Sequence, residues 1–230
     1  RYLKYPAARA AGTAILTRYT LRLLTAQQFE RSALTIAACE VIRRTVPELS
    51  AHPPFTIGML VGRDVTPNWL KKAREYADGK KKDGDRATLL PLERCPWCGT
   101  RLEERRISVD LENRTIITPC PKSDCDFSDG LPIVVVDEAI YESPPTFVIA
   151  TIDKLAQLSS VPDMSKILGR DTKHDPPDLI IQDELHLIND ALGTVAALFE
   201  MATEFLATNA DGSLPKLVGS TATIRQADHQ

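Results

Sequence analysis

The sequence has no long apolar run. Among its 230 residues no stretch of about 18 consecutive apolar side chains occurs, so we expect no membrane-spanning helix. It also lacks the basic-then-apolar start of a secretion signal, and it contains no internal repeat. Its apolar fraction of 43% and charged fraction of 26% are ordinary for a globular domain. We therefore expect a cytoplasmic globular protein.

The charge balance does not indicate a partner by itself. The 28 basic and 31 acidic side chains give a formal net charge of -3. A nucleic-acid motor can still bind a phosphate backbone through a local basic groove and backbone amides, so this balance neither requires nor excludes nucleic acid. The length suits one α/β domain with an insertion.

Short apolar runs alternate with helical patterns along the chain. Apolar residues recur every three or four positions over residues 21–44, as on one face of a helix, and a second helix is expected near 188–206. Continuous apolar strands between helices indicate a parallel sheet with helices on both faces. The expected strands are residues 13–17, 55–62, 133–136, 146–151, 178–181 and 216–220.

Four of the five cysteines form two close pairs. Cys95 and Cys98 make one pair, and 21 residues separate it from Cys120 and Cys125. Without a secretion signal this spacing favours a metal over disulfides, and four thiolates suit tetrahedral zinc. The alternating pattern of residues 106–118 predicts a hairpin between the pairs. We therefore predict a zinc ribbon, with little core of its own, whose folding energy comes from the metal.

Two adjacent carboxylates follow a predicted buried strand. Asp183 and Glu184 come at its carboxyl end, the edge where open α/β sheets bind ligands. In nucleotide hydrolysis one acid holds Mg²⁺ and the next activates the attacking water, and we assign these roles to Asp183 and Glu184 in that order. The alternative is a polar strand end that caps the next helix.

A second acidic pair, Asp137 and Glu138, also follows an apolar run. The prolines at 144 and 145 break any long amphipathic helix behind it, and it directly follows the cysteine region. It is also separated from the strand that ends at Ser220 by a further strand and helix. We interpret this pair as structural.

Two segments near the carboxyl end resemble motifs of superfamily 2 helicases. The run Asp183, Glu184, Leu185, His186 resembles the DExH form of motif II. About 35 residues later, the run from Ser220 to Thr223 resembles motif III. The resemblance implies a RecA-like, P-loop NTPase type of fold. It adds His186 to the catalytic set, and it makes the hydroxyl residues Ser220, Thr221 and Thr223 couple the nucleotide state to nucleic acid.

Two further segments resemble the family's nucleic-acid-binding motifs. Residues 17–28 resemble motif Ia, and residues 149–155 resemble motif Ib. Free N–H groups at helix amino termini can bind phosphates without reading bases. The residues that the two matches assign to nucleic-acid binding are Thr17, Arg18, Arg22, Gln27, Thr151 and Lys154.

Residues 18–33, the cysteine region and residues 140–155 together most resemble the DrmA helicase family of the DISARM anti-phage system. The resemblance implies ATP- and Mg²⁺-driven action on DNA, more than on RNA, and a partner subunit in a defence complex. It divides the chain into residues 1–89 and 133–230, two parts of a first RecA-like domain, around a zinc ribbon at 90–132.

The sequence departs from the family in what it lacks. It contains no GxxxxGK[ST] phosphate loop, which in the family precedes motif Ia, and few residues follow motif III, where a second RecA-like domain is expected. We expect these residues alone to be inactive in ATP hydrolysis. Two alternatives are a degenerate RecA-like scaffold that binds DNA or a protein through its ribbon, and a zinc module fused to an unrelated α/β enzyme.

Overall fold

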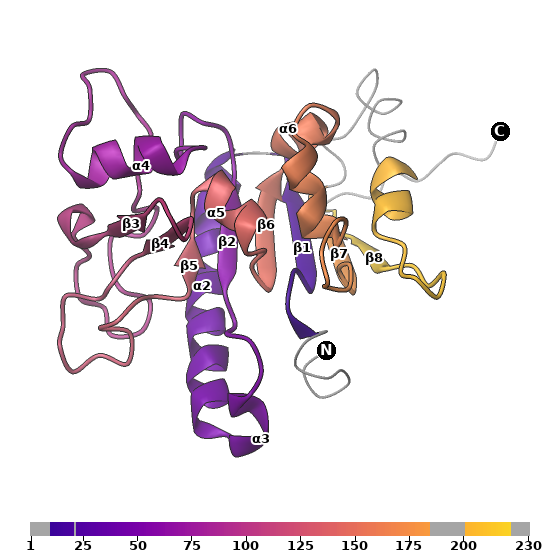
Figure 1. The fold of residues 1–230 in the computed structure, drawn as a ribbon, viewed down its shortest axis with the longest axis horizontal. Helices are drawn as coiled ribbons and strands as arrows, with labels where there is room; N and C mark the ends of the chain where they lie inside the picture. Colours follow the sequence, from indigo (N-terminus) through magenta and orange to yellow (C-terminus); the bar gives the residue numbers. More distant parts are fainter. Residues whose placement is uncertain (1–9, 21, 185–200, 222–230) are drawn as a thin grey trace.

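A six-stranded parallel sheet forms the centre of the molecule in the computed structural model, which describes residues 10–20, 22–184 and 201–221 (Figure 1). The strand order is β5-β2-β6-β1-β7-β8, and every neighbouring pair is parallel. The strands are β1 (Ile15–Tyr19), β2 (Ile57–Leu60), β5 (Ile133–Val134), β6 (Phe147–Thr151), β7 (Leu179–Gln182) and β8 (Lys216–Gly219). The predicted parallel α/β sheet is confirmed.

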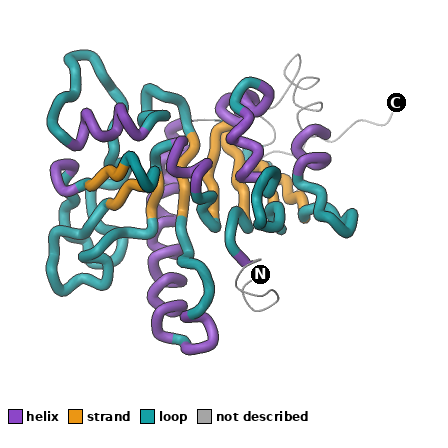
Figure 2. Tube along the Cα trace, viewed as in Figure 1, coloured by secondary structure: helices purple, strands orange, loops and turns teal. Residues whose placement is uncertain are grey.

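Both faces of the sheet carry helices (Figure 2). On one face α2 (Arg22–Thr45) packs Phe29, Ala33 and Ala37 onto the sheet, and this four-residue spacing keeps them on one side of the helix. The other face is covered by α5 (Asp137–Glu142), α6 (Ile152–Leu155), η2 (Ala156–Ser159) and η3 (Pro162–Leu168). Side chains of β6 alternate between the two cores, since Ile149 joins the first and Val148 and Ala150 the second.

The cysteine region lies beside the β5 edge of the sheet, together with α4 (Leu70–Ala77) (Figure 1). It contains η1 (Glu104–Arg106) and the predicted hairpin, now seen as β3 (Ser108–Asp110) paired antiparallel with β4 (Thr115–Ile117). Its apolar side chains are not a separate core. Phe127 and the buried cysteines share one cluster with α2, while Val109 and Ile116 of the hairpin pack with α4.

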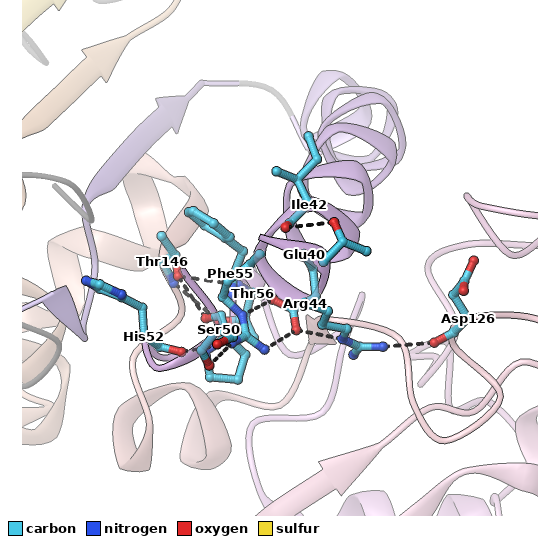
Figure 3. Close-up of polar contacts among 12 residues, drawn as sticks. Glu40, Ile42, Arg44, Ser50, His52, Phe55, Thr56, Asp126 and Thr146 are labelled. Carbon is cyan, nitrogen blue, oxygen red and sulfur yellow. Dashed lines mark hydrogen bonds and ion pairs between the residues drawn. The ribbon is translucent and has the colours of Figure 1, made fainter. Parts of the chain in front are cut away.

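The Glu40 side chain connects α2 to the loop that contains Phe55. Its partner Arg44 connects the same helix to the cysteine region (Figure 3). The buried Glu40 carboxylate accepts hydrogen bonds from Arg43, from Arg44 Nε at 2.9 Å and from the Phe55 N–H at 2.9 Å. Arg44 also donates to the carbonyl of Asp126, and its guanidinium lies 5.1 Å from the Phe127 ring centroid. Arg43 donates further to the backbone carbonyls of Ser50, the last residue of α3 (Pro47–Ser50), and of His52.

Several element boundaries differ from those that the sequence predicts. β1 continues through residue 19, whereas apolarity alone indicated an end at residue 17. β5 has only two residues, whereas the sequence predicted a strand over residues 133–136. Of the helix expected over residues 188–206, the structure describes the end, where 201–206 are helical. None of the described helices is both long and apolar enough to span a membrane.

Candidate functional site

Because β6, β1, β7 and β8 run parallel, their carboxyl ends lie together at one edge of the sheet. Tyr19 pairs with Thr151 across β1 and β6, and Gln182 pairs with Gly219 across β7 and β8. Two backbone hydrogen bonds continue the ladder past the strands. The Asp183 N–H donates to the Arg18 carbonyl at 3.0 Å, and the Ser220 N–H donates to the Gln182 carbonyl at 2.9 Å. The segments containing Asp183 and Ser220, predicted as motifs II and III, therefore leave neighbouring strands at the same edge.

The acidic pair adopts a restrained backbone conformation. Glu184 has a φ of 52°, a left-handed value that costs a non-glycine residue about 1 kcal/mol or more. Its N–H donates to Asp183 Oδ1 at 2.9 Å, which fixes the Asp183 carboxylate, and both side chains are half-buried. Burial, with a further contribution from the Asp183 charge, raises the pKa of Tyr19 to about 12. The Tyr19 hydroxyl therefore stays neutral beside this carboxylate.

Not all of the predicted catalytic and coupling residues fall within the described chain. His186 and Thr223 lie outside the described residues. Ser220 and Thr221 are described and exposed, directly after β8. The edge thus carries two half-buried carboxylates from one strand and two exposed hydroxyl residues from the next.

The predicted motif Ia residues are divided between a strand and a helix. Thr17 and Arg18 lie inside β1 and are each 3% exposed, because the strand continues beyond the point that the apolar pattern indicated. Arg22 is the first residue of α2, and Gln27 is exposed on the same helix. The strand therefore ends at Tyr19 rather than at Thr17, and α2 begins at Arg22.

The predicted motif Ib residues lie around the end of β6. Thr151 is the last residue of that strand and directly precedes α6. Lys154 is only 3% exposed, and its ammonium forms a buried ion pair with Asp137. The Asn68 amide, oriented to satisfy both charges, lies 3.2 Å from Asp137 Oδ2 and 3.3 Å from Lys154 Nζ. In this arrangement Lys154 neutralises a carboxylate inside the fold.

Burial affects the ionisation of Asp137. It raises the pKa of Asp137 to about 6, although the Lys154 charge and hydrogen bond oppose the increase. This triad of Asn68, Asp137 and Lys154 was not predicted from the sequence. Its members come from three separate segments, and no local spacing connects them.

Glu138 has different hydrogen-bond partners from Asp137. Its carboxylate accepts a hydrogen bond from the N–H of Leu70, the first residue of α4, at 2.7 Å, and its own N–H donates to the Asn68 carbonyl at 3.1 Å. These contacts fix the start of α4 against α5. Asp137 and Glu138 therefore both have structural partners. The pair follows β5, which is the outermost strand on the side of the sheet away from β8. It begins the short helix α5, which ends at Glu142, before the two prolines.

The four paired cysteines form one cluster, with their sulfur atoms all within 4.8 Å of one another. The Sγ atoms of Cys98 and Cys120 are 3.5 Å apart, and those of Cys95 and Cys125 are 4.0 Å apart. A tetrahedral zinc with bonds of about 2.3 Å places its sulfur ligands about 3.8 Å apart, so the spacing fits a metal site. Cys39 lies outside this cluster on α2.

Backbone amides also converge on the sulfur atoms. Each of three cysteines has a hydrogen bond from the N–H two residues later: Thr100 for Cys98, Lys122 for Cys120 and Phe127 for Cys125. Gly99 permits the first of these turns with its φ of 73°. Such amides stabilise thiolates around a bound metal, so the cluster could hold a divalent ion such as zinc.

Comparison with known proteins found a relative of this chain. It is 35% identical to "DISARM protein DrmA" of Bacillus paralicheniformis over 265 aligned positions. The alignment covers 96% of this chain and 24% of the relative, so the chain spans about a quarter of that protein's length. No family model matches the chain. The predicted resemblance to DrmA is confirmed over nearly all of the chain.

Proposed function

We propose that this chain forms part of the first RecA-like motor domain of an ATP-dependent superfamily 2 DNA helicase or translocase that acts in an anti-phage defence complex. One structural observation supports this most directly: the segments resembling motifs Ib, II and III leave neighbouring parts of one sheet edge. Homology to a DISARM protein supports the defence context. DNA and a partner subunit are the binding partners proposed.

The acidic pair supplies the proposed hydrolytic chemistry. Asp183 would hold Mg²⁺ through its water shell, with its carboxylate fixed by the Glu184 N–H at 2.9 Å. When bound, this ion would neutralise charge that develops on the ATP phosphates. Glu184 would orient the attacking water and accept its proton, and its restrained backbone would aim the carboxylate. His186 is proposed to complete this set.

The same edge offers groups for coupling and for DNA. Ser220 and Thr221 follow the neighbouring strand, from which their hydroxyls and that of Thr223 would sense the Asp183 carboxylate. Thr151, Arg22 and Gln27 lie at or beyond the carboxyl ends of β6 and β1, where backbone amides can bind phosphates. Thr17, Arg18 and Lys154 would support this surface from inside the fold, because all three are buried.

The cysteine cluster is proposed to bind zinc. Its four sulfurs and three N–H donors match the requirements of a closed structural site. Because the cysteines share a core with α2, the metal would brace the motor domain as well as the hairpin.

ATP turnover by the complete polypeptide tests the assignment of Glu184. We expect Glu184→Gln to lower DNA-stimulated turnover by about a hundredfold or more, because the water loses its general base. Glu112→Gln is the matched control, since this exposed residue lies in the turn of the β3–β4 hairpin. Unchanged turnover in Glu184→Gln would contradict the motor assignment and favour a degenerate scaffold.

A further inference from the structure

A small cavity lies between α5, α6 and the loop before α4. Its volume is about 100 Å³, enough for several water molecules at roughly 10–15 Å³ each. Asp137, Tyr141 and Lys154 are buried at this cavity, while Trp69 is 62% exposed on its rim. This cavity is separate from the site of Asp183 and Glu184. Asp137 follows β5, whereas Asp183 follows β7, and β2, β6 and β1 lie between these two strands.

Two buried polar atoms of residues that line the cavity have neither a hydrogen-bond partner nor an ion pair. They are Asp137 Oδ1 and the hydroxyl of Tyr141. The ion pair with Lys154 uses the other carboxylate oxygen, Oδ2. Leaving such groups unsatisfied costs about 1–3 kcal/mol each, so a ligand that supplies an N–H donor and an acceptor would recover energy here.

The charges around the cavity select against a phosphate. Its walls carry the carboxylates of Asp137, Glu138 and Asp163 against the cations of Lys154 and Arg114. Lys154 is already paired with Asp137, and Arg114 lies 3.6 Å from Glu138. A neutral group that presents N–H donors fits these surroundings better than an anion.

The rim offers a flat apolar surface. The indole of Trp69 lies just before α4, and more than half of it is open to solvent. Stacking of a base on an aromatic ring contributes about 1–3 kcal/mol and does not depend on sequence. A planar heterocycle could therefore stack on Trp69 while one polar edge enters the cavity.

We propose that this cavity binds one nucleobase of a single DNA strand through an exocyclic amino group. The amino group of cytosine or adenine donates to Asp137 Oδ1, and the Tyr141 hydroxyl donates to the adjacent ring nitrogen. Thymine is disfavoured because two carbonyl oxygens flank its ring N–H and would face the carboxylates. This inference rests on the proposed function, and it adds base preference to binding by phosphate contacts alone.

Competition binding with the complete polypeptide tests the proposal. The probe is a fluorescent oligothymidylate, and the competitors are oligothymidylates with one central residue unchanged, replaced by cytosine, or replaced by N4,N4-dimethylcytosine. We expect cytosine to increase affinity roughly five- to tenfold, which corresponds to the net free energy of about one buried hydrogen bond. Dimethylation removes the donor and should return the affinity to that of oligothymidylate.

Two variants connect the preference to the cavity. Tyr141→Phe removes only the hydroxyl, and we expect it to abolish the cytosine preference while affinity for oligothymidylate and the melting temperature stay unchanged. Trp69→Ala should reduce the preference as well, whereas the control Trp97→Phe, in the cysteine region, should not.

Three outcomes would overturn the inference. In the first, the wild-type protein binds all three oligonucleotides equally, which leaves the proposed motor function intact. In the second, Tyr141→Phe keeps the full preference. In the third, free deoxycytidine monophosphate competes as well as the cytosine-bearing strand, which would assign the cavity to a mononucleotide. Absence of binding to any strand would instead contradict the proposed function itself.

Discussion

At the scale of single residues, Glu40 is a buried carboxylate held by charged partners. Burial opposes its ionisation, but hydrogen bonds from Arg43, Arg44 and the Phe55 N–H outweigh that effect and hold the pKa of Glu40 below its ordinary value. A lowered pKa means that the folded state binds the proton more weakly than the unfolded state. Its contribution to stability is therefore present above pH 4.5, the ordinary value, and is lost as the pH falls further.

We expect Glu40→Gln to lower the free energy of unfolding by about 2–3 kcal/mol at neutral pH, because two arginines lose their charged acceptor. The difference from wild type should shrink as the pH is lowered through the range where Glu40 becomes protonated. Chemical denaturation at a series of pH values measures this. The control is Glu48→Gln, which changes an exposed carboxyl on α3. A difference that stays constant with pH would contradict the proposed network.

The pKa of Asp137 is shifted in the opposite direction to that of Glu40. Burial raises the pKa of Asp137 from 3.8 to about 6, so the folded state binds this proton more tightly than the unfolded state. Its titration favours folding at low pH, and that contribution is lost as the pH rises from 3.8 to about 6. The charge that remains above this range is held by Lys154 and Asn68.

We expect Asp137→Asn to change the pH dependence of the free energy of unfolding, because it removes a carboxyl whose pKa burial raises to about 6. The stability advantage of wild type over the variant should be larger near pH 4 than at pH 7, the reverse of the trend for Glu40→Gln. Denaturation at both pH values tests this, with the exposed Asp129→Asn as control. A trend parallel to that of Glu40→Gln would show that Asp137 is not buried as described.

At the scale of elements, the cysteine region depends on its sulfur cluster for local order and on α2 for its core. The hairpin strands have three residues each, too few to be stable alone. Phe127 and the cysteines fill space against α2, and Arg44 reaches the same region from the helix. Loss of the proposed zinc ion should therefore loosen the helix contact as well as the hairpin.

We expect the purified protein to carry one zinc ion per chain, and a strong chelator to lower its melting temperature. Cys95→Ser should remove the metal and cause a similar loss of stability, because a closed site needs all four ligands. Cys39→Ser is the matched control, since Cys39 lies on α2 outside the cluster. Elemental analysis and thermal melting provide the measurements. Full zinc content in Cys95→Ser would exclude the proposed site.

At the scale of the whole molecule, the acidic pair needs partners that these 230 residues do not contain. The sequence has no GxxxxGK[ST] loop to hold the phosphates of a nucleotide. The homologous DrmA protein is about four times as long as the aligned region. The exposed edge strand β8 and the exposed Phe205 near it are consistent with further contacts at this end of the sheet.

We expect the 230-residue chain by itself to show no DNA-stimulated ATP hydrolysis at the rate of a motor. The complete polypeptide, assayed beside it, should show such turnover. A coupled phosphate-release assay with and without single-stranded DNA measures both. Turnover by the isolated chain that disappears in Glu184→Gln would contradict this expectation, because it would mean that the nucleotide is held without a phosphate loop.

The sequence by itself determined the parallel α/β class, the sulfur cluster, the hairpin and the relation to DrmA. These features rest on local signals: apolar runs mark buried strands, and two closely spaced pairs of cysteines are typical of a metal-binding site. The order along the chain also predicted that the segments with Asp183 and Ser220 leave the sheet together, because consecutive parallel strands commonly become neighbours.

Only the tertiary structure decided which charged side chains are inside. Arg18 and Lys154 look like surface cations in the sequence, yet the continued strand buries one and the Asp137 carboxylate holds the other within the fold. The partners of Asp137 lie far away in sequence, at Asn68 and Lys154, so no local pattern could connect them. The sheet brings these segments together through long-range packing, and burial then decides which charges pair.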